Sequence, residues 1–141
     1  MDQTISQERL KEVISEGDII VSILPETPET INYFSKEVFA AMKKGVQFVN
    51  VGRGTSVVEE DLLEALDNGT ISFAALDVFQ TEPLNESSPL WNHEKTLITP
   101  HISGSVEHFR DALFAVIEPN AVSFVKEGKV SVNEISYDKN Y

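Results

Sequence analysis

Short apolar runs rich in β-branched residues alternate with segments of helical periodicity along most of this 141-residue chain. The run from Asp18 to Leu24 is apolar at consecutive positions, which is typical of a strand covered on both faces of a parallel sheet. Strands are predicted over residues 18–24, 47–51, 72–78 and 96–99. Helices are predicted over residues 6–16, 35–44, 58–68 and 106–127, followed by a polar, partly extended tail over 129–141. This alternation predicts an α/β fold with a parallel sheet and right-handed crossovers.

Residues 27–29 predict one further helix start. Thr27 is a suitable cap, Pro28 is favoured in a first turn, and the carboxylate of Glu29 is stabilised near the positive end of a helix dipole. The pattern therefore predicts a short helix between the first strand and residue 35.

The composition excludes several classes of protein. A net charge of −12 disfavours binding to a phosphate backbone, so no nucleic-acid partner is expected. The chain has no cysteine, hence no disulfide and no thiolate metal site. No apolar run approaches the ~20 residues of a membrane helix, and the first residues lack the features of a signal peptide. We therefore expect a cytoplasmic protein without a membrane partner.

Polar side chains follow the predicted strands at their carboxyl ends. Pro25, Arg53 and His101 come just after three of the strands, and Asp77 closes the strand over 72–78. Ligands of open α/β sheets bind at this edge. Glycines on both sides of Arg53 allow the backbone to approach a ligand closely, and a guanidinium there can hold a carboxylate through two parallel hydrogen bonds. An exposed arginine in a turn is the simpler interpretation of this tripeptide alone.

His101 and Glu82 form a possible proton-transfer pair. The imidazole of a histidine titrates near neutral pH, and a carboxylate that accepts from one ring nitrogen raises the basicity of the other. Taken singly, each residue is better explained as structural, as are His93 and His108, which have no supporting motif. Asp77 ends an apolar strand, where a carboxylate needs a partner or acts as a cap of the next loop.

Together these segments resemble one known family. The chain contains the following segments: I-L-P-E-T-P-E-T (23–30), F-V-N-V-G-R-G-T-S-V-V-E-E-D-L-L-E-A-L (48–66), A-A-L-D-V-F-Q-T-E-P-L (74–84) and T-P-H-I-S-G (99–104). In order and spacing they resemble the D-isomer-specific 2-hydroxyacid dehydrogenases over residues 7–135, closest to the glyoxylate/hydroxypyruvate reductases.

The resemblance implies a set of roles. Arg53 would bind the carboxylate of a 2-keto acid and polarise its keto oxygen, His101 would exchange the proton, and Glu82 would orient His101. Asp77 would meet the nicotinamide carboxamide of NAD or NADP. Cofactor-lining positions would be Leu24, Pro25, Thr30, Val51, Gly52, Arg53, Asp77, His101, Ser103 and Gly104. No metal is required, because Arg53 and His101 supply the electrophilic assistance.

One expected motif is missing. The chain contains no G-x-G-x-x-G, the loop that cradles the pyrophosphate at a helix N-terminus. We therefore expect residues 1–104 to be the C-terminal half of a Rossmann-like, doubly wound dinucleotide-binding domain. Residues 105–141 would be a helix and tail that pack on a substrate domain not contained in the chain. Weak or absent cofactor binding and no turnover by the chain alone are then expected.

The same interpretation predicts self-association. The strand over 18–24 would have an unpaired edge and the long helix an uncovered apolar face, and such surfaces favour a homodimer. A non-catalytic module that senses dinucleotide or drives oligomerisation is the alternative function. Arg53, Glu82 and His101 favour the enzyme, whereas a stable oligomer without turnover would favour the module. A phosphate- or formate-type substrate ranks last, because formate-type members would use different residues near the histidine.

Overall fold

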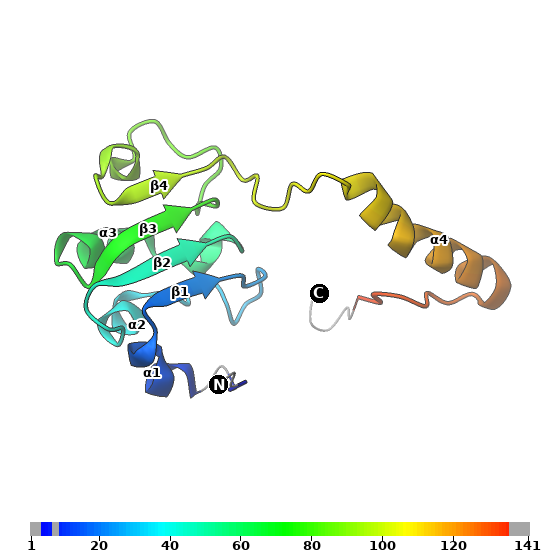
Figure 1. The fold of residues 1–141 in the computed structure, drawn as a ribbon, viewed down its shortest axis with the longest axis horizontal. Coiled ribbons are helices and arrows are strands. Elements are labelled where there is room, and N and C mark those ends of the chain that lie inside the picture. Colours follow the sequence, from blue (N-terminus) through cyan, green and yellow to red (C-terminus); the bar gives the residue numbers. More distant parts are fainter. Residues whose placement is uncertain (1–3, 7–8, 136–141) are drawn as a thin grey trace. The chain divides into compact units, whose positions relative to one another are not determined.

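The chain divides into two units, residues 1–103 and residues 104–141. In the computed structural model, residues 4–6 and 9–135 are described. The first unit contains the sheet and its crossover helices, and the second contains the long helix α4 (Figure 1). Each unit is described on its own below.

The first unit is built on one parallel sheet. Its strands are β1 (Ile19–Ser22), β2 (Val46–Asn50), β3 (Ile71–Leu76) and β4 (Thr96–Ile98), in the order β1-β2-β3-β4. The predicted α/β class and parallel sheet are therefore confirmed, with each strand one to three residues shorter or shifted relative to its predicted range. Among the described residues β1 and β4 form the two edges.

The strands end at a common level. The register pairs Ser22 with Asn50, Asn50 with Leu76, and Leu76 with Ile98, so the last residues of all the strands form one row. The loops that leave this row carry the predicted site residues. The sheet register therefore gathers these loops at one edge.

The helices of the first unit are short. They are α1 (Leu10–Val13), which continues as the 3-10 turn Ile14–Glu16, then α2 (Lys36–Ala40) and α3 (Glu59–Asp67), with further 3-10 turns at Gly54–Ser56 and Pro89–Asn92. The predicted helix over 6–16 is present in its second half, and positions 7 and 8 lie outside the described residues. Gly69 follows α3 with a φ of 76°, the left-handed conformation that ends many helices. The predicted helix over 35–44 is shorter in the structure, because α2 ends at Ala40, and Gly45, with a φ of 85°, lies in the turn before β2.

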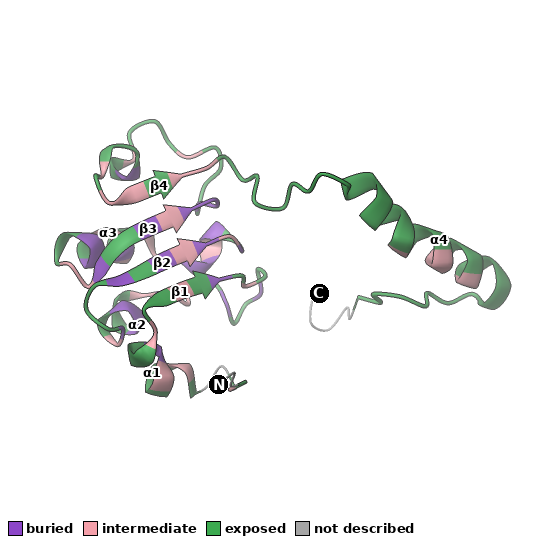
Figure 2. Cartoon of the chain, viewed as in Figure 1, coloured by how far each residue is buried: buried purple, intermediate pink, exposed green. Residues whose placement is uncertain are grey.

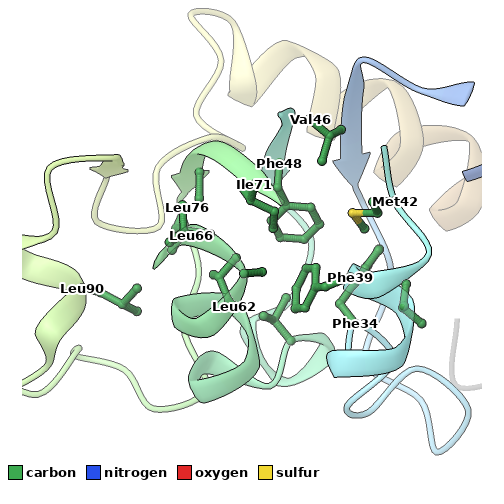
Figure 3. Close-up of a cluster of buried hydrophobic side chains, with 14 of the residues drawn as sticks. Phe34, Phe39, Met42, Val46, Phe48, Leu62, Leu66, Ile71, Leu76 and Leu90 are labelled. Carbon is green, nitrogen blue, oxygen red and sulfur yellow. The ribbon is translucent and has the colours of Figure 1, made fainter. Parts of the chain in front are cut away.

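The hydrophobic core lies between the sheet and the pair α2 and α3, which cover the same face (Figures 1 and 3). Phe48 of β2 is fully buried and packs edge-on against Phe34 and Phe39, with ring centroids 5.0 and 5.6 Å apart. Leu62 and Leu66 of α3 complete the contact from the other helix. Aromatic rings in this arrangement add stabilisation beyond their buried area.

The opposite face of the sheet is uncovered within this unit. Ile19 and Val21 of β1 are 58% and 55% exposed, and Ile23, just beyond the strand, is 74% exposed (Figure 2). The prediction that the strand over 18–24 is covered on both faces is therefore wrong for this structure. The reason is that both crossover helices lie on one face, so the apolar residues that alternate with the core positions meet solvent.

Residues 27–32 form a turn and not the predicted helix. The Thr27 carbonyl accepts from the N–H groups of Thr30 and Ile31, which makes one helix-like turn. Asn32 then takes a φ of 56°, and its N–H donates to the Thr55 carbonyl, so the chain cannot continue as a helix. The Thr30 hydroxyl donates to the Pro25 carbonyl and accepts from the Thr27 N–H, which closes the turn internally.

The second unit is a helix with a returning tail. Helix α4 (Phe109–Glu127) starts three residues after its predicted start and ends at Gly128, which has a φ of 69°. The side chain of Asn120 accepts from the N–H groups of Ser131 and Val132 and donates to the Val132 carbonyl. The tail is thereby held against the helix. The predicted tail beyond residue 135 lies outside the described residues.

Helix α4 has no buried residue, and large apolar side chains such as Phe109, Phe114 and Val125 are exposed (Figure 2). Within the described part of the chain, none of the helices combines the length and the apolar character that crossing a bilayer requires.

Phe48 and Phe73 provide a matched test of which face is the core. Phe48→Ala should cost about 3–5 kcal/mol of unfolding free energy, because it leaves a cavity among the aromatic rings. Phe73→Ala, on the uncovered face, should cost less than about 1 kcal/mol. Urea denaturation of both variants measures the difference, and equal losses would contradict this assignment of the core.

Candidate functional site

The glycine before Arg53 brings two strand ends together. A Cβ at Gly52 would lie 2.6 Å from the Leu24 carbonyl oxygen and 2.7 Å from the Leu24 nitrogen. The loop after β2 therefore packs directly on the backbone of the loop after β1. No side chain larger than hydrogen fits at position 52 without moving one of these loops.

Gly54, the glycine after Arg53, allows the same close approach to the loop after β3. A Cβ at Gly54 would lie 1.9 Å from the carbonyl carbon of Phe79 and 2.0 Å from its oxygen. The sequence suggested that these glycines allow a ligand to approach the backbone. In the structure they allow two neighbouring loops of the protein to approach, and the approach of a ligand stays a prediction.

The side chain of Arg53 is exposed to solvent beside this packed turn. The Asn50 side chain fixes the turn, because its Oδ1 accepts from the Gly52 N–H and its Nδ2 donates to the Arg53 carbonyl. The Ser56 hydroxyl donates to the same carbonyl over 2.7 Å. The exposed guanidinium donates through Nη1 to the Gly52 carbonyl, and across the described residues no hydrogen bond or ion pair joins it to Glu82 or His101.

Glu82 and His101 are in direct contact. The distance between His101 Nδ1 and Glu82 Oε2 is 2.7 Å, and Glu82 Oε1 accepts from the Phe79 N–H over 3.0 Å. The bond to His101 is the main cause that lowers the pKa of Glu82, and burial opposes it. A charged Glu82 accepts only, so Nδ1 carries the proton and Nε2 is the nitrogen left for other partners.

Asp77 is buried at the end of β3 and is fully engaged with the loop after β4. Its Oδ1 accepts from the Thr99 hydroxyl and the Ile102 N–H, and its Oδ2 accepts from the Ser103 N–H over 2.8 Å. Burial raises the pKa of Asp77, but the hydrogen bonds from Ser103, Thr99 and Ile102 outweigh it and hold the pKa far below the usual range. Asp77 is therefore charged at neutral pH.

A pocket of about 610 Å³ opens beside the Glu82–His101 pair. Apart from Asp77, Glu82, Thr99 and His101, its walls are apolar. They are formed by Phe79, Pro83, Leu84, Trp91, Ile98 and Pro100.

The other predicted cofactor residues are placed at the same edge but differ in exposure. Leu24 and Val51 are half-buried, whereas Pro25 and Ser103 are exposed. Thr30 is buried, and its hydroxyl is used inside the turn over 27–32, so it faces the protein. Gly104 belongs to the second unit and is not placed relative to these residues.

Sequence reasoning missed two residues that build the site. Asn50 shapes the Arg53 turn, and Thr99 bonds to Asp77. Asn50 carried a signal, since it is a polar residue inside an apolar strand and must find partners when buried. Thr99 carried none. In the described part of the chain no group of histidine and acidic residues could hold a metal ion.

Solved structures similar to this chain support a definite class. An NADPH-dependent glyoxylate/hydroxypyruvate reductase from Sinorhizobium meliloti, in complex with NADP and sulfate, superposes with a TM-score of 0.88 at 33% identity, covering 99% of this chain and 45% of that one. A probable 2-hydroxyacid dehydrogenase from Rhizobium etli, in complex with NADP, HEPES and tartaric acid, gives a TM-score of 0.86 at 35% identity, covering 99% and 44%. Fold and site therefore define a Rossmann-like dinucleotide-binding domain.

Residues 1–103 match the family described as D-isomer specific 2-hydroxyacid dehydrogenase, NAD binding domain. The chain belongs to this family, which confirms the resemblance found in its sequence. An uncharacterised protein of Corynebacterium melassecola is 36% identical over 140 residues, which is 99% of this chain and 46% of that protein. The chain thus spans about half the length of this curated relative.

Gly54→Ala tests the packed turn. The added methyl would overlap the Phe79 backbone, so we expect a loss of more than about 3 kcal/mol in unfolding free energy. Gly104→Ala is the control, because a Cβ there meets nothing within 4 Å. Chemical denaturation measures both, and an unchanged Gly54→Ala variant would refute the close approach.

Glu82→Gln tests the contact with His101 through its pH dependence. Because folding lowers the pKa of Glu82, its contribution is present above the ordinary value of 4.5 and is lost as the pH falls through the lowered value. The wild type should therefore exceed Glu82→Gln in melting temperature at pH 6.5, and the gap should close toward pH 3. Glu60→Gln, in an exposed position of α3, controls for the lost charge, and an identical gap at both pH values would contradict the contact.

Proposed function

We propose that this chain is part of an enzyme that interconverts 2-keto acids and D-2-hydroxy acids with NAD or NADP. The observation that carries the proposal is the 2.7 Å contact of His101 Nδ1 with Glu82 Oε2 beside an apolar pocket. A carboxylate that fixes one ring nitrogen leaves the other free to exchange a proton with substrate. A domain that only served as a scaffold would have no need of this pair.

His101 is proposed as the proton donor in the reduction. From its Nε2 a protonated imidazole donates to the keto oxygen, which becomes the hydroxyl group, and in the reverse direction Nε2 takes the proton back. Glu82 orients the ring and stabilises its charged form. When bound, a reduced nicotinamide dinucleotide supplies the hydride to the keto carbon.

Arg53 is proposed to bind the substrate carboxylate. Guanidinium has five N–H donors, and within the described residues this side chain makes one hydrogen bond, to the Gly52 carbonyl. The remaining donors fit a carboxylate in a bidentate arrangement and can polarise the keto oxygen beside it. Arg53 and His101 then act on the same carbonyl group from the loops after β2 and β4, the strands on either side of β3.

The residues at the carboxyl edge fit a dinucleotide. Exposed Pro25 and Ser103 and half-buried Leu24 and Val51 offer backbone and apolar contacts, as residues that line a ligand do. A carboxylate has about four acceptor sites, so Asp77 is proposed to accept also from the carboxamide of the cofactor. Gly52, Thr30 and Gly104 complete the proposed set, with Thr30 acting by shaping its turn.

The proposed division of the chain follows from the same assignment. Residues 1–104 are the C-terminal half of the dinucleotide-binding domain, and residues 105–141 are a helix and tail that pack on a substrate domain. Glyoxylate and hydroxypyruvate are the proposed substrates. The similarity to the Sinorhizobium meliloti reductase supports this choice.

A chimera tests the catalytic roles. Residues 1–141 replace the matched part of the Sinorhizobium meliloti reductase, and reduction of hydroxypyruvate and glyoxylate is followed by loss of NADPH absorbance. The chimera should turn over, and His101→Gln should lower kcat/KM by about 10²–10⁴-fold, the usual contribution of one general acid. Arg53→Gln should raise KM and lower kcat together, since it binds the substrate and polarises it.

His108→Gln is the matched control, because this histidine stands at the N-cap position of α4, makes no capping hydrogen bond through its side chain and is not part of the proposed site. A folded chimera that binds NADPH but shows equal rates for wild type and His101→Gln would overturn the proposal. The chain by itself should bind NADPH weakly and show no turnover, because the pyrophosphate loop is missing from it.

A specific observation favours a second candidate, a homodimer in which the chain acts as an oligomerisation or dinucleotide-sensing module. Ile19 and Val21 of β1 and Ile23 just beyond it form an exposed apolar strip, and β1 is also an edge strand among the described residues. Exposed edges of this kind pair with a second copy. Light scattering should give a dimer mass that Val21→Lys converts to a monomer, and a monomeric wild type at high concentration would exclude it.

A further inference from the structure

The main chain at His101 has an unusual conformation. Its φ is 53°, in the left-handed region that a non-glycine residue adopts only at a cost in free energy. Such a residue persists where its neighbours hold it in place. The contacts around residues 101–103 therefore identify what holds the histidine.

Asp77 makes all of the main-chain contacts at this point. Its carbonyl accepts from the His101 N–H over 2.9 Å. Its carboxylate accepts from the N–H groups of Ile102, at 2.9 Å, and Ser103, at 2.8 Å. Successive N–H groups converge in this way to form a concavity for an anion, and here the anion is a buried side chain of the protein.

The Thr99 hydroxyl completes the arrangement from the other side. It donates to Asp77 Oδ1, so residues on both sides of His101 are bonded to one carboxylate. Asp77 is itself fixed to the sheet, because its N–H donates to the Asn50 carbonyl of β2 over 3.0 Å. The backbone of His101 is thus held at a fixed position relative to the end of the sheet.

Glu82 holds the same residue by its ring. One oxygen accepts from His101 Nδ1, and the other accepts from the Phe79 N–H. The loop of residues 77–82 therefore contains two carboxylates that act on one histidine, the first through the main chain and the second through the imidazole.

We propose that Asp77 is a positioning residue, which aligns the His101 ring with Glu82 by holding residues 99–103 in the turn where His101 has a positive φ. This goes beyond a contact between Asp77 and the cofactor, and its consequence for catalysis rests on the proposed function. Without the carboxylate, position 101 relaxes to an ordinary backbone conformation and Nδ1 leaves Glu82.

The pKa of Glu82 distinguishes positioning from a simple effect of charge. His101 and Asp77 are the titratable groups that act on Glu82. The bond from His101 lowers its pKa, whereas the negative charge of Asp77 raises it. Removing the charge alone would therefore lower the pKa of Glu82. Losing the alignment would raise it toward 4.5, its ordinary value.

The experiment is a ¹³C NMR titration of the Glu82 carboxyl in the full chain, with the amide spectrum as a check of folding. Asp77→Asn should raise the pKa of Glu82. Thr99→Val, which keeps the shape of threonine and removes the hydroxyl, should raise it by a smaller amount, and Thr99→Ser should restore the wild-type value. A merely structural role of Thr99 would not be rescued by serine in this readout.

A folded Asp77→Asn protein in which the pKa of Glu82 is unchanged or lower overturns the proposal. If Asp77→Asn does not fold, Thr99→Val decides in the same way, because an unchanged pKa in that variant overturns it and a rise supports it. The titration needs no turnover. An inactive chimera with a normal Glu82 titration would therefore count against the proposed function and leave the positioning role in place.

Discussion

Close backbone packing at Gly52 and Gly54 is the constraint on which the site depends. At Gly52 the loop after β2 touches the backbone of Leu24, and at Gly54 it touches the backbone of Phe79. These contacts hold the loops after β1, β2 and β3 together beyond the row of residues that ends the strands. Arg53 lies between the two contacts, so its backbone is fixed by atoms that belong to its neighbours, while its guanidinium remains exposed.

Much of this fold could be predicted from the sequence, because apolar periodicity reports burial directly. The alternation of β-branched runs and helical segments predicted the strands, α3 and α4, with small errors at their ends. Two errors have a common cause. Whether both faces of β1 are covered, and whether residues 27–32 continue as a helix, depends on contacts with distant segments, such as the bond from the Asn32 N–H to the Thr55 carbonyl. Local patterns contain no information on these.

The candidate site was likewise predictable from the sequence only in part. The resemblance to the family named Arg53, Glu82 and His101, and the structure brings Glu82 and His101 into contact. The role of the flanking glycines was interpreted from the residue type alone, and the structure adds that they allow the backbones of Leu24 and Phe79 to approach. Thr99 could not have been found, since a threonine before a proline has many uses. Only the fold shows that its hydroxyl meets a buried carboxylate.

The hydrogen bonds of Asn120 hold the tail to α4, so these stabilising contacts lie within the second unit. The Asn120 side chain makes its bonds to residues 131 and 132, and no partner from the sheet is involved in them. Because these bonds are local and α4 has no buried residue, the helix and tail have the features of a segment that opens separately from the sheet. Amide hydrogens of α4 and those of β2 would belong to different exchange classes. The second unit can in this way open while the contacts around His101 persist.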